Sequence, residues 1–202
     1  MTDATADAAA RIVALRDGGK VDEAFALALE TFGDEIGGFL AARLLDGDRA
    51  ADAFALFAED AWRGLPGFRG EASLRTWLYV IARRAAVRVL RERARAARDL
   101  PLSQAGAVER LAAELRSATT RWRRTEVKDR LHALRAQLSD DERELLVLRV
   151  DRALSWEEIA GALELDAGDP SALKRQCAAL RKRFERLKER IRALAAQEGL
   201  LS

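Results

Sequence analysis

The chain has 202 residues, of which 49% are hydrophobic and 34% charged, with 13 Gly and 3 Pro. This composition excludes a disordered, collagen-like or low-complexity chain, and the length suits one large or two small domains. The single Cys177 and the single His132 leave no residues for a disulfide or a Cys/His zinc site. Neither a signal peptide nor a membrane span of about 18 apolar residues is found, so a cytoplasmic protein without membrane insertion is expected.

The formal net charge of +2 conceals three charged segments. Residues 1–60 hold five bases against thirteen acids, a balance of −8. Residues 81–100 hold seven bases against two acids (+5), and residues 171–192 hold nine bases against two acids (+7). Together they indicate a nucleic-acid partner and a second, differently charged contact surface, although each segment alone is equally consistent with a solvated helix face.

Helix-favouring residues dominate the chain and no segment alternates as a strand does, which predicts an all-α fold. Residues 49–63 carry an apolar stripe at helical spacing with acids beside it. The glycines and proline of residues 64–70 end that helix in a loop. A long basic helix, capped by Ser73, is expected to follow up to about residue 98. The pattern predicts a helical hairpin with one acidic and one basic arm.

The helical pattern lapses near residue 99 and becomes firm again after residue 125. Asp140, Asp141 and Glu142 are expected to form the acidic first turn of a helix. Residues 155–158, SWEE, have the form of a capping box, and Asp169-Pro170 the form of an N-cap followed by proline. A short capped helix, a turn and a longer helix with one apolar and one basic face predict a helix-turn-helix, in which Cys177 is a small buried hydrophobe.

The expected fold is therefore two small helical domains joined by a partly helical linker, the second domain being the helix-turn-helix. The expected boundaries are an N-terminal helical extension over 1–34, a first domain over 35–98, a linker over 99–125, a second domain over 126–195 and a tail over 196–202.

Two stretches, GLPGFRGEASLRTWLYVIARRAA and LSDDERELLVLRVDRALSWEEIAGAL, resemble bacterial RNA polymerase sigma factors of the compact extracytoplasmic-function type. The resemblance covers residues 35–98 and 127–190, in the order of the family. It implies that the first domain is region two, which binds core RNA polymerase and reads and opens the minus-ten promoter element. The second domain is then region four, which reads the minus-thirty-five element. Core RNA polymerase and promoter DNA are the partners implied, an anti-sigma factor is a further partner that the resemblance allows, and no cofactor is implied.

The resemblance also implies three sets of contact residues. The polymerase-binding residues would be Asp52, Leu56, Glu59 and Asp60. The residues for the minus-ten element and for melting would be Phe68, Arg69, Trp77, Tyr79, Arg83, Arg84 and Arg88, because aromatic stacking on an unpaired base offsets the cost of flipping it. Trp77 also has the spacing of a core residue. The upstream element would be contacted by Ser171, Lys174, Arg175, Arg181 and Lys182, of which Lys174 and Arg175 can reach guanine edges or phosphates.

Two departures from the family leave alternatives open. Ala55 and Leu56 stand where Gln and Glu are usual, and the turn over 163–174 is about three residues longer than usual. A sigma-derived DNA-binding regulator with weakened polymerase binding is therefore one alternative, and a helical protein that sequesters a sigma factor is another. An enzyme is not expected, because the sequence has no Gly-rich phosphate loop, no HExxH motif and no nucleophile, base and acid set.

Overall fold

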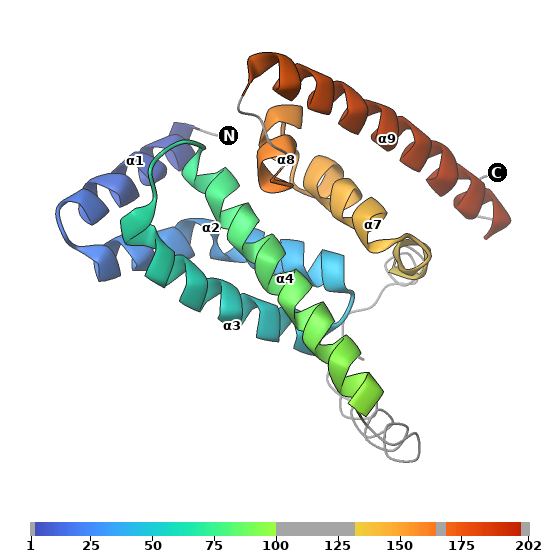
Figure 1. Ribbon diagram of the computed structural model, residues 1–202, viewed down its shortest axis with the longest axis horizontal. Helices are drawn as coiled ribbons and strands as arrows, with labels where there is room; N and C mark the ends of the chain where they lie inside the picture. Colours follow the sequence, from blue (N-terminus) through green and yellow to red (C-terminus); the bar gives the residue numbers. More distant parts are fainter. Residues whose placement is uncertain (1–2, 100–131, 165–168, 199–202) are drawn as a thin grey trace.

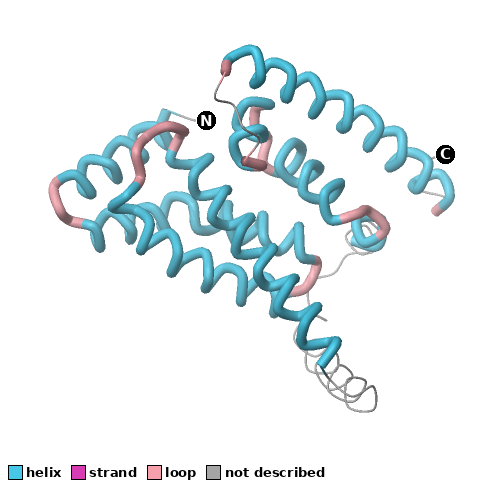
Figure 2. Tube along the Cα trace, in the orientation of Figure 1, coloured by secondary structure: helices cyan, strands magenta, loops and turns pink. Residues whose placement is uncertain are grey.

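Helices and the turns between them make up the described chain, which has no strand among residues 3–99, 132–164 and 169–198 (Figures 1 and 2). These are the residues that the computed structural model describes. The all-α class predicted from composition is confirmed. The expected linker, 99–125, lies outside the described residues except for Asp99, as do the first residues of the expected second domain.

The first half of the chain contains α1 (Asp3–Asp17), α2 (Val21–Leu44), α3 (Gly47–Gly64), the 3-10 turn η1 (Leu65–Gly67) and α4 (Leu74–Asp99). α1 packs on α2, and α3 packs on both α2 and α4 (Figure 1). The domain boundary expected after residue 34 lies inside α2. This helix continues through the boundary because its buried residues keep a helical spacing from Ala24 to Leu44.

Local chemistry explains where α3 and α4 begin and end. The Asp46 carboxylate accepts a hydrogen bond from the backbone nitrogen of Arg49 at 3.0 Å and caps α3. The predicted break follows at residues 64–70, where Gly70 has φ +75°, a conformation that glycine adopts without strain. The Ser73 hydroxyl accepts from the backbone nitrogen of Thr76 at 3.0 Å, so the predicted cap of α4 is confirmed.

The second half contains α7 (Asp140–Leu146), the π-helical turn η2 (Val147–Asp151), α8 (Trp156–Ala162) and α9 (Pro170–Gln197). Capping boxes start α7 at Ser139 and α8 at Ser155; the second was predicted and is confirmed. The helix predicted to begin at the acidic turn 140–142 is α7. Cys177 is buried in the apolar stripe of α9, as expected. Residues 165–168 of the long turn between α8 and α9 lie outside the described residues.

α4 of the first half contacts the second half. It packs against α2 and α3 on one side and against α8 on the other (Figure 1). Buried side chains of both halves form one continuous apolar cluster, in which Leu148, Leu154 and Ile159 of the second half are at most 1% exposed. This packing brings the acids of α7 and α8 next to the basic residues of α4.

Candidate nucleic-acid interface

The loop between η1 and α4 begins at an aromatic pair. Phe68 is 9% exposed, and its ring centroid lies 5.3 Å from that of the half-buried Trp77. Arg16 of α1 contacts this pair, since its Nη1 donates to the Phe68 carbonyl at 2.5 Å and its guanidinium carbon lies 5.6 Å from the Phe68 ring centroid. Arg69 is exposed, with Nη1 3.9 Å from Glu71 Oε1. The two predicted aromatic residues therefore anchor the loop, and Arg69 is open to solvent.

Tyr79 lies in the core, although the sequence predicted it at the DNA surface. Its ring is fully buried and packs edge-on against Phe39 at a centroid distance of 5.2 Å, while its hydroxyl donates to Glu35 Oε1 at 2.7 Å. Burial and the neighbouring Glu35 carboxylate raise the pKa of the Tyr79 phenol. Because α4 is covered by α2, α3 and α8, this side chain has no ring face open to a base in the observed arrangement.

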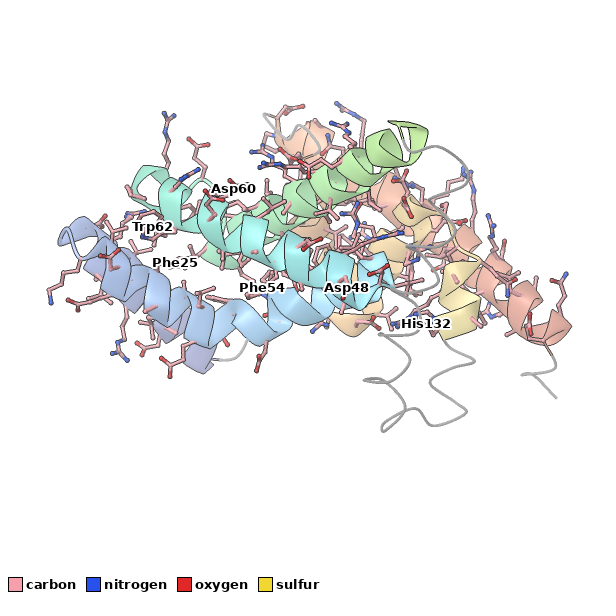
Figure 3. All side chains as sticks on the ribbon, turned by 90° about the horizontal axis from the view of Figure 1, so that it is seen from below. Phe25, Asp48, Phe54, Asp60, Trp62 and His132 are labelled. Atoms are coloured by element: carbon pink, nitrogen blue, oxygen red, sulfur yellow. The ribbon has the colours of Figure 1, made fainter. Side chains whose placement is uncertain are left out.

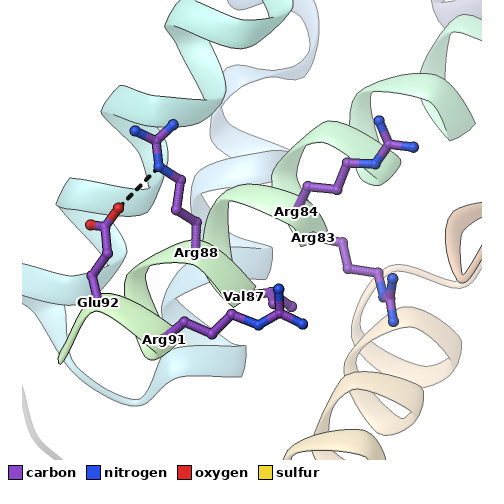
Figure 4. A pocket seen from close by; sticks show the side chains of 6 residues that line it. All are labelled: Arg83, Arg84, Val87, Arg88, Arg91 and Glu92. Carbon is purple, nitrogen blue, oxygen red and sulfur yellow. Dashed lines mark hydrogen bonds and ion pairs between the residues drawn. The ribbon is translucent and has the colours of Figure 1, made fainter. Parts of the chain in front are cut away.

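Three of the four arginines predicted to contact the minus-ten strand lie on α4 and border a hollow of about 560 Å³. This hollow is lined by Arg83, Arg84, Val87, Arg88, Arg91 and Glu92 (Figure 4). Arg88 Nε lies 3.1 Å from Glu92 Oε1, and Arg84 Nε donates to Glu164 Oε1 at 3.1 Å. The hydrogen bonds from Arg84 hold the pKa of the Glu164 carboxyl below its usual value. The four arginines of the lining are groups suited to phosphate, but Arg83, Arg84 and Arg88 are paired with carboxylates in the observed arrangement.

The predicted upstream-element residues are all on the exposed side of α9: Ser171, Lys174, Arg175, Arg181 and Lys182. The Asp169 carboxylate caps this helix and accepts from the backbone nitrogens of Ser171 and Ala172, both at 3.1 Å. The Arg181 guanidinium carbon lies 5.9 Å from the ring centroid of Trp156 on α8. Arg181 therefore also contacts the preceding helix, whereas Lys174 and Arg175 lie at the open start of α9.

The predicted polymerase contacts lie along α3. Asp52 is exposed and Leu56 half-buried, and with Ala55, Val89 and Glu92 they line a hollow of about 300 Å³ between α3 and α4. Glu59 is exposed and pairs with Arg63 at 2.7 Å. Asp60 is half-buried and lies near Trp62 towards the end of α3 (Figure 3). An apolar hollow with acids beside it fits a protein surface that is partly apolar and partly basic.

Comparison with known proteins finds similarity to RNA polymerase sigma factors. The family model described as sigma-70 region 2 matches residues 29–96, from within α2 to within α4. The RNA polymerase sigma-H factor of Pseudomonas aeruginosa is 29% identical over 149 residues, which are 72% of this chain and 77% of that protein. Residues 29–96 therefore match region 2 of the sigma-70 factors, and over 149 residues the chain is similar to a sigma factor. Its function is that of a sigma factor in transcription initiation.

Two solved structures are similar to most of this chain. The sigma factor RpoE from Bartonella quintana, in complex with the anti-sigma factor NepR, has a TM-score of 0.62 and 18% identity, covering 85% of this chain and 96% of RpoE. CnrH, in complex with the cytosolic domain of CnrY, has a TM-score of 0.63 and 20% identity, covering 95% and 99% of the two chains. The similarity extends beyond region two to the second half, and the expected extracytoplasmic-function type fits it. Among the described residues, no helix has the length and apolar character that a membrane span requires.

The acids that meet the basic face of region two were not predicted. Glu144 of α7 is 2% exposed, and its Oε1 lies 3.4 Å from Arg43 Nε and 3.2 Å from Arg83 Nε. Burial raises the pKa of the Glu144 carboxyl, and the two arginine charges oppose this shift. The sequence spacing could have indicated that Glu144 is buried. It precedes the buried Leu148 by four residues and so lies on the same face of the helical segment.

Proposed function

We propose that this sigma factor divides its contacts among three helices. Core RNA polymerase would bind the face of α3 that bears Asp52, Leu56, Glu59 and Asp60. The loop after η1 and the arginines of α4 would hold the opened minus-ten element, and α9 would contact the upstream element. The observation that supports this proposal is the presence, in one chain, of the region-two match over 29–96 and a helix-turn-helix with an exposed basic face.

The proposal assigns different tasks to the residues of the minus-ten set. Arg69, Arg83, Arg84 and Arg88 would contact the strand, because guanidinium groups pair with phosphates in a bidentate manner. Phe68 and Trp77 would support the loop, and Tyr79 would serve the core. We further propose that the protein is a non-catalytic subunit, that it acts in the cytoplasm, and that an anti-sigma factor binds it, as NepR binds RpoE.

Reconstituted transcription tests the proposal as a whole. The full chain, mixed with core RNA polymerase and a template that carries its own upstream region, is expected to give a runoff transcript that core polymerase alone does not give. Absence of both polymerase binding and promoter-dependent transcript would contradict the proposal.

A DNA-binding regulator with weakened polymerase binding is the second candidate. It is favoured by the apolar pair Ala55 and Leu56, which lines the hollow beside Asp52 where the family usually has polar residues. The affinity for core polymerase separates the two functions, since both predict DNA binding. A dissociation constant far above that of a reference sigma factor, with DNA binding retained, would favour the regulator.

Removal of Lys174 and Arg175 is expected to weaken upstream-element binding and leave polymerase binding unchanged. The logarithm of the DNA association constant falls as log salt rises, and each lost phosphate contact makes this slope shallower by about 1. Lys174→Ala with Arg175→Ala should therefore make the slope shallower by up to about 2. Fluorescence anisotropy of an upstream duplex at several salt concentrations measures this slope. Arg186→Ala with Arg192→Ala removes the same charge further along α9 and is the control. An equal loss in both variants would contradict base and phosphate contact at the start of α9.

Replacing Arg16 with Ala is expected to weaken minus-ten recognition through the loop. The change removes a hydrogen bond from a charged donor to the Phe68 carbonyl and a cation–π contact with its ring. We expect a roughly five- to tenfold loss, about 1–1.4 kcal/mol, in holoenzyme binding to a labelled minus-ten single strand.

The control for Arg16 is Arg11→Ala, which removes an exposed arginine from the same helix. Upstream-duplex binding is measured for both variants. If Arg11→Ala loses as much single-strand binding, or if Arg16→Ala loses upstream binding as well, Arg16 does not position the loop.

A further inference from the structure

Three carboxylates of the second half are paired with three arginines of α4. These six residues, here termed the α4 seam, are Arg75, Arg83 and Arg84 with Glu158, Glu144 and Glu164. Arg75 Nη1 lies 3.4 Å from Glu158 Oε1, and Arg83 Nε lies 3.2 Å from Glu144 Oε1. Arg84 Nε donates to Glu164 Oε1 at 3.1 Å, and Arg83 Nη1 lies 3.4 Å from Glu164 Oε2. The acids come from α7, from the start of α8 and from the residues after α8, so they meet α4 over more than two turns.

Glycines allow the two halves to approach this closely. A Cβ atom at Gly161 of α8 would lie 2.9 Å from the Cγ2 of Thr76 on α4. A Cβ atom at Gly38 of α2 would collide with the guanidinium of Arg152, which follows η2. Real Cβ contacts are longer than this, and Thr76 is itself only 5% exposed. At Gly38 the flexible end of Arg152 can move aside, whereas at Gly161 the short, buried Thr76 side chain has little room, so the close packing of α8 on α4 depends on Gly161.

The carboxylates of the seam are bound to guanidinium groups that could otherwise bind the phosphates of a nucleic acid. Guanidinium groups form the same forked, charge-assisted hydrogen bonds with carboxylates and with phosphates. Arg83 and Arg84 are two of the residues proposed to contact the minus-ten strand, and their side chains are 27% and 65% exposed. A phosphate can pair with these arginines at full strength only after the glutamates have moved away.

The seam leaves the proposed polymerase face uncovered. Asp52 and Glu59 of α3 are exposed, and α3 lies on the other side of α4 from α8 and α9 (Figure 1). Docking of the second half therefore pairs Arg83 and Arg84 of α4 with carboxylates while the α3 face stays open to a protein partner.

We propose that the second half of this sigma factor is an internal competitor of promoter DNA. Its carboxylates neutralise Arg83 and Arg84 in the closed arrangement, and the strand gains these arginines only when the α4 seam opens. This inference rests on the proposed function, because it concerns the same minus-ten contacts. The apparent affinity for DNA is then the affinity of the open form multiplied by the fraction of molecules that are open.

A variant that opens the seam by steric conflict tests the proposal. Gly161→Leu places a branched side chain against Thr76, and leucine favours helix over glycine, so α8 itself is not weakened. The full chain, without polymerase, is titrated against a fluorescein-labelled single strand of 20 thymidines, and small-angle X-ray scattering measures its radius of gyration. We expect a larger radius, a roughly fivefold or greater gain in affinity, and a log–log salt slope steeper by about 0.7 for each arginine freed.

Gly47→Leu is the matched control, because a Cβ atom there meets nothing within 4 Å. It should leave the radius and the affinity unchanged. A second variant, Glu164→Gln, keeps the packing and removes one seam carboxylate. Its control is Glu157→Gln, which removes an exposed acid of α8 and so measures the general effect of one negative charge.

Each outcome bears on the proposal. Gains in Gly161→Leu and Glu164→Gln that exceed their controls support it. An expanded Gly161→Leu chain with wild-type affinity overturns it, as does a Glu164→Gln chain with wild-type affinity. Equal gains from Glu157→Gln and Glu164→Gln also overturn it, because they would show an effect of net charge alone. If no transcript forms in the reconstituted assay, the proposed function fails, whereas the radius of gyration and the thymidine titration are measured without polymerase.

Discussion

Replacing Glu144 with Ala is expected to lower the free energy of unfolding by about 3–5 kcal/mol, the usual penalty for removing one partner of a buried ion pair. The Glu144 carboxylate joins α7 to Arg43 of α2 and to Arg83 of α4. The Arg43 side chain is 5% exposed, and burial already lowers the pKa of its guanidinium. Without Glu144, the Arg43 charge would stay buried beside Arg83 with no carboxylate between them. The chain can avoid this state by detaching α7, so undocking of the second half should account for much of the loss.

Urea denaturation followed by circular dichroism and by tryptophan fluorescence measures the expected change. Trp156 reports on the second half, and Trp62 and Trp77 report on the first. Glu157→Ala removes an exposed acid and should change stability by no more than about 0.5 kcal/mol.

A double variant separates the ion pair from its surroundings. Glu144→Leu with Arg43→Met replaces the buried pair by apolar side chains, a change that is often neutral or stabilising. Arg83 is 27% exposed and can turn towards solvent. We therefore expect the double variant to be more stable than Glu144→Ala. A double variant as unstable as the single one would show that the loss comes from packing rather than from the unpaired charge.

The sequence predicted the helices well where local rules act alone. The apolar stripe of residues 49–63 and the glycines and proline after it predicted α3 and its end, and Ser73, Ser155 and Asp169 predicted three helix starts. Each of these features depends on residues at most four positions apart. They are therefore readable without knowledge of the tertiary structure.

The site was predicted less completely, because its electrostatics depend on distant residues. Arg83 and Arg84 were predicted to contact the minus-ten strand, but their ion-pair partners Glu144 and Glu164 lie more than 60 positions away and were not predicted. Tyr79 was assigned to the minus-ten element as an aromatic residue able to stack on a base, whereas the packing of α4 against α2, α3 and α8 buries it. A charge pattern identifies which residues can bind a phosphate, and only the packing decides which of them are already paired.

Replacing Phe57 with Ala should destabilise the first half by about 3–5 kcal/mol, the range expected for removing a buried phenylalanine ring. Phe57 is 1% exposed and lies on the face of α3 that packs against α2 and α4. Its removal leaves a cavity in the core that α3 shares with α2 and α4, and α3 and α4 carry the two proposed binding faces. Loss of polymerase binding and loss of DNA binding are therefore expected together, which no substitution on a single exposed face should produce.

Phe54→Ala provides the matched control for this prediction. The two rings are neighbours on α3 with centroids 5.6 Å apart, but Phe54 is only half-buried and borders an open hollow of about 540 Å³ beside Gly33 and Gly37 of α2. Water can fill the space that the Phe54 ring leaves, so the loss in free energy of unfolding should be well below that of Phe57→Ala. Urea denaturation of both variants measures the difference. Equal losses would mean that the α2–α3 hollow is closed in solution and that Phe54 belongs to the core that supports both binding faces.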